Sequence, residues 1–205
     1  MKLLGSPGSP YVRKVRIVLI EKGIPFAFQR IDLLDPASGL SEANPLGKIP
    51  ALIRDNGKAL YDSSVIVDYL DALVPAPRLI PDELEGRAEV KRWEAVADGI
   101  MDATVAISHD YILSDVEGGG LAWSNANQRR KIDLGLALME KELGTRDWCH
   151  GSALSLADIA CVVSLAYMDR ALPAVDWRKG HPKLRGLFNR LEARDSFKAT
   201  RHSTE

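Results

Sequence analysis

Two short segments of this 205-residue chain hold residues whose types and spacing could do chemistry. In the first, Ser9 precedes Pro10 at a turn between a short apolar run and a helical pattern. A helix N-terminus favours negative charge, so a hydroxyl at this position could face an anion. The same serine could be a simple N-cap, whose side-chain oxygen accepts a hydrogen bond from an otherwise unpaired N–H. The residues alone leave both roles open.

The second segment runs from Asn44 to Leu52 and contains the pair Ile49–Pro50. A proline has no N–H to donate to a sheet, so it must lie at an edge or in a special turn. A cis Ile49–Pro50 bond would meet this constraint and leave the N–H and C=O of Ile49 free to pair with an extended peptide. An ordinary trans proline in a loop is the alternative.

Short strands and helices must position these segments. Strands are predicted at residues 2–5, 26–33, 51–54 and 58–61. Pro10 suits the first position of a helix, and Ser63 or Ser64 can cap another helix after the last strand. Between the last two strands, Asn56-Gly57 predicts a type I′ hairpin turn, because that turn needs φ > 0 at both central residues. The first part of the chain is therefore expected to be an α/β domain.

The character of the sequence changes at residues 74–81, where three prolines fall within seven residues. Such a segment cannot lie inside a helix or a central strand, so it is predicted to be an interdomain linker. Beyond it, apolar residues recur at helical spacing around 90–104, 132–143 and 184–191, with no convincing strand. The expected division is a first domain at 1–76, a linker at 77–86 and an all-helical domain at 87–205.

A capping box is predicted at the start of one helix in the second half. Ser155 at the N-cap can bond the N–H of Asp158, and the Asp158 carboxylate can reach back to the N–H of Ser155. Leu154 and Ile159 are spaced for the accompanying hydrophobic staple. We interpret Asp158 as structural, because a buried helix end needs its N–H groups satisfied.

Composition narrows the possible classes of function. A net charge of −1 lacks the basic footprint of a nucleic-acid-binding protein. No apolar run is long enough to span a bilayer, and the N-terminus has no signal-peptide pattern. The two isolated cysteines suit a reducing compartment, so a cytoplasmic location is expected. The histidines and cysteines show no zinc spacing, and no metal site is predicted.

Four motifs, in order, resemble those of the glutathione transferase superfamily. They are Ser9 to Arg16, Asn44 to Pro50, Asp62-Ser63, and Leu154 to Ala160, and together they cover nearly the whole chain. The chain resembles a serine-type bacterial glutathione S-transferase-like protein. This resemblance implies a thioredoxin-like α/β N-terminal domain followed by an all-α C-terminal helix bundle, the glutathione transferase-like fold.

The resemblance implies that Ser9 is the catalytic residue. In serine-type transferases, the serine at this position donates a hydrogen bond to the glutathione sulfur, and stabilising the thiolate lowers the thiol pKa. Ser6 is a second hydroxyl in the same turn, although Ser9, directly before the proline, is the closer match. Tyr11 is expected to form a wall of the substrate pocket.

The resemblance also implies a set of glutathione-binding residues. Ile49, before a cis Pro50, would pair through its backbone with the cysteinyl part of the tripeptide. Ser63 would bond the γ-glutamyl carboxylate, and Asp62 would help to meet the ammonium group. Lys48 would lie near the glycyl carboxylate, and a solvated lysine in a turn is the alternative.

The implied function is transfer of the glutathione thiolate to a small hydrophobic electrophile, as in detoxification. Glutathione would be the co-substrate, without a metal, and the protein a homodimer that binds neither nucleic acid nor membrane. One alternative is a non-catalytic glutathione-binding or regulatory module with the same fold. A second is a glutathione-dependent thiol reductase or peroxidase, for which the cysteine expected at the start of the helix is absent. The identity of the electrophile follows from no readable motif.

Overall fold

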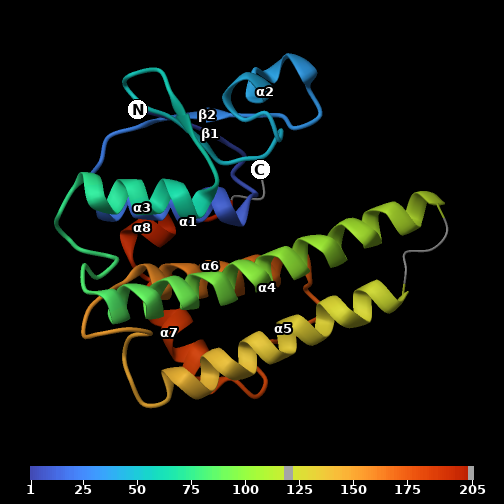
Figure 1. Ribbon diagram of the computed structural model, residues 1–205. Coiled ribbons are helices and arrows are strands. Elements are labelled where there is room, and N and C mark those ends of the chain that lie inside the picture. The colour runs from blue at the N-terminus through green and yellow to red at the C-terminus, as the bar shows by residue number, and fades with distance from the viewer. Residues whose placement is uncertain (118–121, 203–205) are drawn as a thin grey trace. The chain divides into compact units, whose positions relative to one another are not determined.

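The structure, a computed structural model, describes residues 1–117 and 122–202 and divides into two compact units (Figure 1). Unit 1 comprises Met1–Ile80 together with the segment that begins at Ala193, and unit 2 comprises Pro81–Glu192. The sequence-based division assigned that last segment to the helical domain. It groups with unit 1, where Phe197 is fully buried and its carbonyl accepts from Arg13 Nη2 at 3.2 Å, and Arg194 forms an ion pair with Glu21, 2.8 Å between Nη2 and Oε2.

Unit 1 is built on a four-stranded sheet with the order β2-β1-β3-β4. Its strands are β1 (Lys2–Gly5), β2 (Ala27–Arg30), β3 (Ala51–Ile53) and β4 (Ala59–Leu60). β1 pairs in parallel with β2 and antiparallel with β3, which pairs antiparallel with β4. The parallel pair is possible because helix α1 (Pro10–Glu21) crosses from the end of one strand to the start of the other.

The remaining helices of unit 1 are α2 (Leu40–Ala43), α3 (Ser63–Leu73) and α8 (Asp195–Lys198), with a short 3₁₀ helix at Pro36–Ser38. α1 and α3 lie side by side, and α8 packs against α1 (Figure 1). One face of α1 is apolar and fully buried, at Val12, Val15 and Leu19. This arrangement confirms the predicted thioredoxin-like α/β domain.

The turn between β3 and β4 differs from the predicted type I′ hairpin. Gly57 has φ of +77°, whereas Asn56 does not have positive φ. The N–H of Gly57 donates to the carbonyl of Arg54 at 2.9 Å, which closes a turn one residue longer. In a three-residue loop only the last residue needs the left-handed conformation. Asn56 instead accepts a hydrogen bond from the N–H of Lys58 through its side chain, at 3.0 Å.

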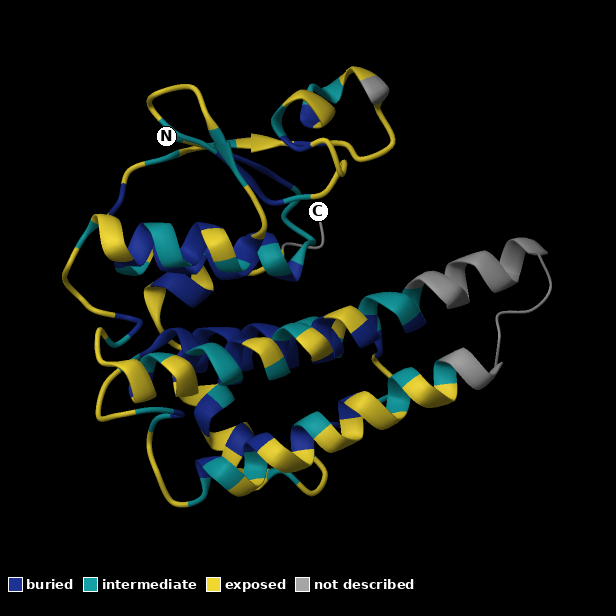
Figure 2. Ribbon diagram, in the orientation of Figure 1, coloured by how far each residue is buried: buried dark blue, intermediate teal, exposed yellow. Residues whose placement is uncertain are grey.

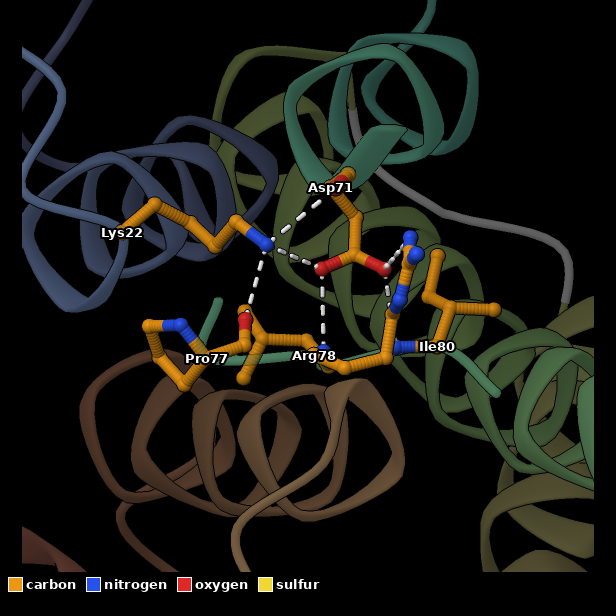
Figure 3. Close-up of polar contacts among 6 residues, drawn as sticks. Lys22, Asp71, Pro77, Arg78 and Ile80 are labelled. Atoms are coloured by element: carbon orange, nitrogen blue, oxygen red, sulfur yellow. Dashed lines mark hydrogen bonds and ion pairs between the residues drawn. The ribbon is translucent and has the colours of Figure 1, made fainter. Parts of the chain in front are cut away.

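A buried ion pair between Lys22 and Asp71 attaches the proline-rich segment before Ile80 to the ends of α1 and α3 (Figure 3). The Lys22 ammonium, just after α1, donates to Asp71 Oδ1 at 2.6 Å, to the Asp71 carbonyl at 3.2 Å and to the Pro77 carbonyl at 2.7 Å. The Asp71 carboxylate accepts from the N–H groups of Leu79 at 2.9 Å and Ile80 at 3.0 Å. This Lys22–Asp71 network holds the proline-rich segment against the ends of α1 and α3.

Unit 2 contains the helices α4 (Leu84–Glu117), α5 (Ala122–Leu143), α6 (Leu156–Ala171) and α7 (Pro182–Glu192). α4 packs against both α5 and α6, and α7 packs against α5 and α6. Figure 2 shows α6 as largely buried, in contrast to the exposed face of α5. No strand occurs in the part of unit 2 that the structure describes, which confirms the predicted all-α fold. Among the described helices, none is long and apolar enough to cross a membrane.

The capping box at the start of α6 is present as predicted. The Ser155 N–H donates to Asp158 Oδ2 at 2.9 Å, and the Ser155 hydroxyl donates to the same oxygen at 2.6 Å. The other carboxylate oxygen accepts from the N–H of Cys149 at 2.7 Å, a contact that the sequence did not reveal. Burial raises the pKa of Asp158 above its usual value, against the lowering effect of the hydrogen bonds from Cys149 and Ser155.

Candidate functional site

The register of the sheet brings the three predicted site segments to one end of unit 1. Leu4, near the end of β1, pairs with Ala51, the first residue of β3. The turn that leads to Ser9 therefore lies beside the segment that precedes β3. Leu52 pairs with Leu60, so β4 also finishes at this end of the sheet and leads directly into the start of α3. Segments far apart in the sequence thus converge because their strands are neighbours.

Ser9 is the N-cap of α1, with φ −79° and ψ 127°. Its Oγ accepts a hydrogen bond from the N–H of Val12 at 3.4 Å, and its own N–H donates to the Ser6 carbonyl at 3.0 Å. The cap contact uses an oxygen lone pair, so the hydroxyl hydrogen can still be donated to another acceptor. The two roles that the sequence left open are therefore compatible. Tyr11 lies half-buried in the first turn of the same helix.

Asn44 organises the turn before β3, a role that the sequence reasoning missed. Its side chain donates to the Lys48 carbonyl at 2.7 Å and accepts from the N–H of Leu46 at 3.1 Å. Its backbone carbonyl accepts from Gly47 at 2.9 Å, and Gly47 has φ of +62°. Asn44 itself is 2% exposed. An asparagine followed by proline is a known turn-initiating pair, and that signal could have identified it.

The Ile49–Pro50 peptide bond is cis, as predicted. The Ile49 side chain packs against a buried cluster that includes Leu4, Leu40 and Ala51. Among the described residues, no hydrogen bond involves the backbone of Ile49. A side chain anchored in the core and an unpaired backbone just before the start of β3 suit the pairing of an extended peptide. Lys48, one residue earlier, is exposed.

Asp62, rather than Ser63 or Ser64, is the N-cap of α3. The reason is that Asp62 Oδ1 accepts both the N–H of Ser64, at 3.0 Å, and its hydroxyl, at 2.8 Å. Aspartate is among the strongest N-cap residues. Ser63 occupies the first position of the helix and is 3% exposed. The preceding Tyr61–Asp62 peptide bond is also cis.

The Asp62 carboxylate is stabilised in its charged form. Burial acts to raise its pKa, but hydrogen bonds from Ser64 and Val65 and the positive charge of Lys14 outweigh burial and lower the pKa below its usual value. An ionised carboxylate at the edge of the site can neutralise a cationic group of a ligand. In the described part of the chain, no group of three His, Cys, Asp or Glu side chains is arranged to hold a metal ion.

Comparisons with known proteins place this geometry in a family. A family model described as the glutathione S-transferase N-terminal domain matches residues 3–78, and the corresponding C-terminal domain model matches residues 108–190. The chain is 34% identical to YibF, a GST-like protein of Escherichia coli K12, over 98% of both chains. The chain belongs to the glutathione S-transferase family.

Two further proteins that are similar to this glutathione S-transferase family chain bear on the site. A crystal structure of a glutathione S-transferase from Methylobacillus flagellatus KT, with glutathione bound, has a TM-score of 0.95. It is 40% identical, and the similarity covers 98% of this chain and 99% of the other. A probable maleylacetoacetate isomerase of Drosophila melanogaster is 30% identical, over 94% of this chain and 77% of its own length. Glutathione binding therefore occurs in a structure that closely matches this transferase-family chain.

Proposed function

We propose that this protein is a glutathione transferase of the serine type, in which Ser9 activates the thiol of bound glutathione. The observation that carries the proposal is the geometry of Ser9. It caps α1 through its oxygen and keeps a hydroxyl hydrogen to donate at the N-terminus of a 12-residue helix. The helix dipole there adds to the stabilisation of an anion.

Glutathione would bind at the end of the sheet where the three segments meet, namely the turn before α1, the turn before β3 and the start of α3. The unpaired backbone of Ile49 would pair with the cysteinyl residue of the tripeptide. The start of α3, with Ser63 at its first position, would bind the γ-glutamyl carboxylate, because the N–H groups at a helix N-terminus donate hydrogen bonds to anions. Asp62, whose pKa is lowered, would face the γ-glutamyl ammonium. Exposed Lys48 would meet the glycyl carboxylate.

The chemistry would begin with loss of the thiol proton to solvent. A free thiol has a pKa near about 8.5, and only its thiolate attacks well. Lowering that pKa by one to two units needs about 1.4 to 2.7 kcal/mol, which a charged hydrogen bond and a helix terminus can supply. The thiolate sulfur then forms a bond to an electrophilic carbon of a small hydrophobic substrate. The leaving group departs with the electron pair of its broken bond.

A second candidate is a glutathione-dependent cis–trans isomerase, because one relative is named a probable maleylacetoacetate isomerase. The same activated thiolate could add to a polarised double bond and leave again after rotation. A thiol reductase has less support, because both cysteines, Cys149 and Cys161, are buried in unit 2.

We also propose that the protein is a cytoplasmic homodimer. Light scattering would test the dimer, and cell fractionation would test the location.

The experiment compares the wild type with Ser9→Ala and, as a matched control in the same turn, Ser6→Ala. Thiolate absorbance of the glutathione complex is measured against pH, alongside rates of conjugation to a haloaromatic and of isomerisation of a cis-dienoic acid. We expect Ser9→Ala to raise the pKa of the bound thiol and to lower turnover by about ten- to a thousandfold. Ser6→Ala should change both much less.

The outcomes separate the candidate functions. A wild-type complex that leaves the thiol pKa at its solution value would show that the protein does not activate glutathione, and the binding-module alternative would replace this proposal. Isomerisation without conjugation would assign the same site to the second candidate. Greater damage from Ser6→Ala than from Ser9→Ala would retain the site but change the donor.

A further inference from the structure

An open cavity of about 350 Å³ lies within unit 2, between the loop that follows α5 and one face of α7. Residues 143–146 form one side, and α7 contributes the other from Pro182 to Arg190. Helices α5 and α7 pack against each other (Figure 1). Small-molecule sites typically have volumes of roughly 300 to 1,000 Å³, so this cavity is large enough for a small ligand. None of the proposed glutathione-binding residues belongs to it.

The charged residues that line the cavity are all cationic. They are Arg146, Lys183 and Arg190, each exposed at the surface. None of the described lining residues is acidic. Three cations around one concave surface attract an anion more strongly than the same charges spread over a flat surface, since clefts focus the field.

Two of these cations are held in place by hydrogen bonds to backbone carbonyls. An Nη2 group of Arg146 donates to the backbone carbonyl of Glu142 at 2.5 Å, and that of Arg190 donates to the backbone carbonyl of Asp147. A carbonyl carries no net charge, so these hydrogen bonds do not neutralise the guanidinium groups, although the charge of Arg146 also interacts with Glu89. Guanidinium groups fixed in this way are suited to the paired hydrogen bonds that a phosphate accepts.

The N-terminus of α7 does not itself explain the site. Glu140 accepts the N–H of Lys183 at 3.0 Å through Oε1 and the N–H of Leu184 at 2.9 Å through Oε2. Both carboxylate oxygens are thus engaged by the first turn of the helix. The attraction for an anion must come from the three cationic side chains, whose combined charge exceeds that of Glu140 and of Glu89, which interacts with Arg146.

Gly186 leaves the backbone of α7 bare where the helix lines the cavity. It lies inside α7 and lines the cavity, and a Cβ at this position would meet no atom within 4 Å. Its φ is not in the left-handed region, so neither backbone conformation nor packing requires glycine. Glycine inside a helix costs about 0.5 to 1 kcal/mol relative to alanine. A bare backbone at this point leaves room for a molecule to approach closely.

We propose that this cavity is a binding site for a small soluble molecule that carries a phosphomonoester group. The phosphate oxygens would contact Arg146, Lys183 and Arg190, and the rest of the molecule would lie over Gly186. The site is separate from the proposed glutathione site and does not depend on its chemistry. A phosphate group could also come from a lipid headgroup, and the experiment distinguishes these two sources.

The test is calorimetric titration of the full chain with glycerol 3-phosphate, and co-sedimentation with phosphatidic acid vesicles, at low ionic strength because salt screens exposed charges. The variants are Lys183→Gln, which removes one cation, and Gly186→Leu, which fills the cavity. Arg185→Gln is the matched control, since Arg185 is exposed on the same helix but does not line the cavity. Thermal unfolding of each variant verifies that it folds.

We expect saturable binding of glycerol 3-phosphate by the wild type, weakened about fivefold or more in Lys183→Gln and in Gly186→Leu and less than about twofold in Arg185→Gln. No co-sedimentation with phosphatidic acid vesicles is expected. Absence of saturable binding at millimolar concentration, or equal weakening by Arg185→Gln, would overturn the site. Binding to vesicles alone would overturn the soluble ligand. Glutathione affinity, measured in parallel, should be the same in all variants.

Discussion

Replacing Lys22 with methionine tests the buried Lys22–Asp71 ion pair, which holds the proline-rich segment of unit 1 in place. Methionine keeps much of the length of the lysine side chain but removes the ammonium group. In the native structure, that group serves three acceptors, and the Lys22 side chain is 0% exposed. The variant would leave the Asp71 carboxylate 4% exposed and without its closest cation.

The expected loss of stability follows from the groups left behind. Removing one partner of a buried pair typically costs about 3 to 5 kcal/mol, because the remaining charge stays desolvated. Here the N–H groups of Leu79 and Ile80 still solvate the Asp71 carboxylate. Arg78, 3.8 Å from Asp71 Oδ2, offers partial compensation. The carbonyl of Pro77 also loses its donor, so we expect a loss near the middle of that range, about 4 kcal/mol.

The measurement must report on unit 1. All four tryptophans lie in unit 2, so their fluorescence would follow the other unit. Hydrogen exchange at the amides of Leu79 and Ile80 measures the affected region directly, and urea unfolding followed by circular dichroism gives the loss of stability of the whole chain. Lys198→Met is the control, because Lys198 forms only an exposed ion pair with Asp195, at 3.7 Å, and should change stability little.

A double-mutant cycle with Asp71→Leu completes the test. The Lys22→Met/Asp71→Leu double variant should be more stable than the sum of the single losses predicts, since neither charge is then left alone. A loss below about 1 kcal/mol in Lys22→Met, or one no larger than in Lys198→Met, would refute the reasoning. So would unchanged protection of the Leu79 and Ile80 amides.

Two further predictions concern the site and the capping box. Asn44→Ala should weaken glutathione binding about tenfold, since it removes both side-chain hydrogen bonds of the turn before β3. Calorimetry measures this effect, and Asn56→Ala in the exposed β3–β4 turn should leave the affinity unchanged. The raised pKa of Asp158 means that the folded state holds this proton more tightly than the unfolded chain. Its contribution to stability is full below the ordinary pKa of about 4 and is lost as pH rises through the raised folded value. The wild-type advantage over Asp158→Asn, measured by urea unfolding, should therefore narrow as pH rises, and a constant difference would contradict the assignment.

Local patterns predicted most of the secondary structure, because the interactions that decide it lie within a few residues. The capping box is an example, since Ser155 and Asp158 are three residues apart and satisfy each other. The same reasoning was less accurate in deciding which of several adjacent residues takes a given conformation or capping role. Asp62 caps α3 in place of Ser63 or Ser64, and Gly57 alone takes the left-handed conformation expected of Asn56 as well.

Contacts between distant residues could not be predicted in this way. Lys22 and Asp71 are 49 residues apart, and Arg194 and Glu21 are 173 apart. Nothing in the local sequence of a lysine at the end of a helix distinguishes a buried partner from solvent. For the same reason, the sequence placed the last segment of the chain in the helical domain, although its ion pair joins it to unit 1.

The candidate site shows how the two kinds of information combine. Each of its segments has a local signal, a serine before a proline, an Ile–Pro pair and an acidic N-cap, and each signal alone has an ordinary structural explanation. Their convergence depends on the pairing of Leu4 with Ala51 and of Leu52 with Leu60. A slip of one residue in either pairing would turn the following side chains to the other face of the sheet. The register of the two pairings therefore decides whether these separate turns form one site, and it is fixed by the buried face of the sheet rather than by the site residues themselves.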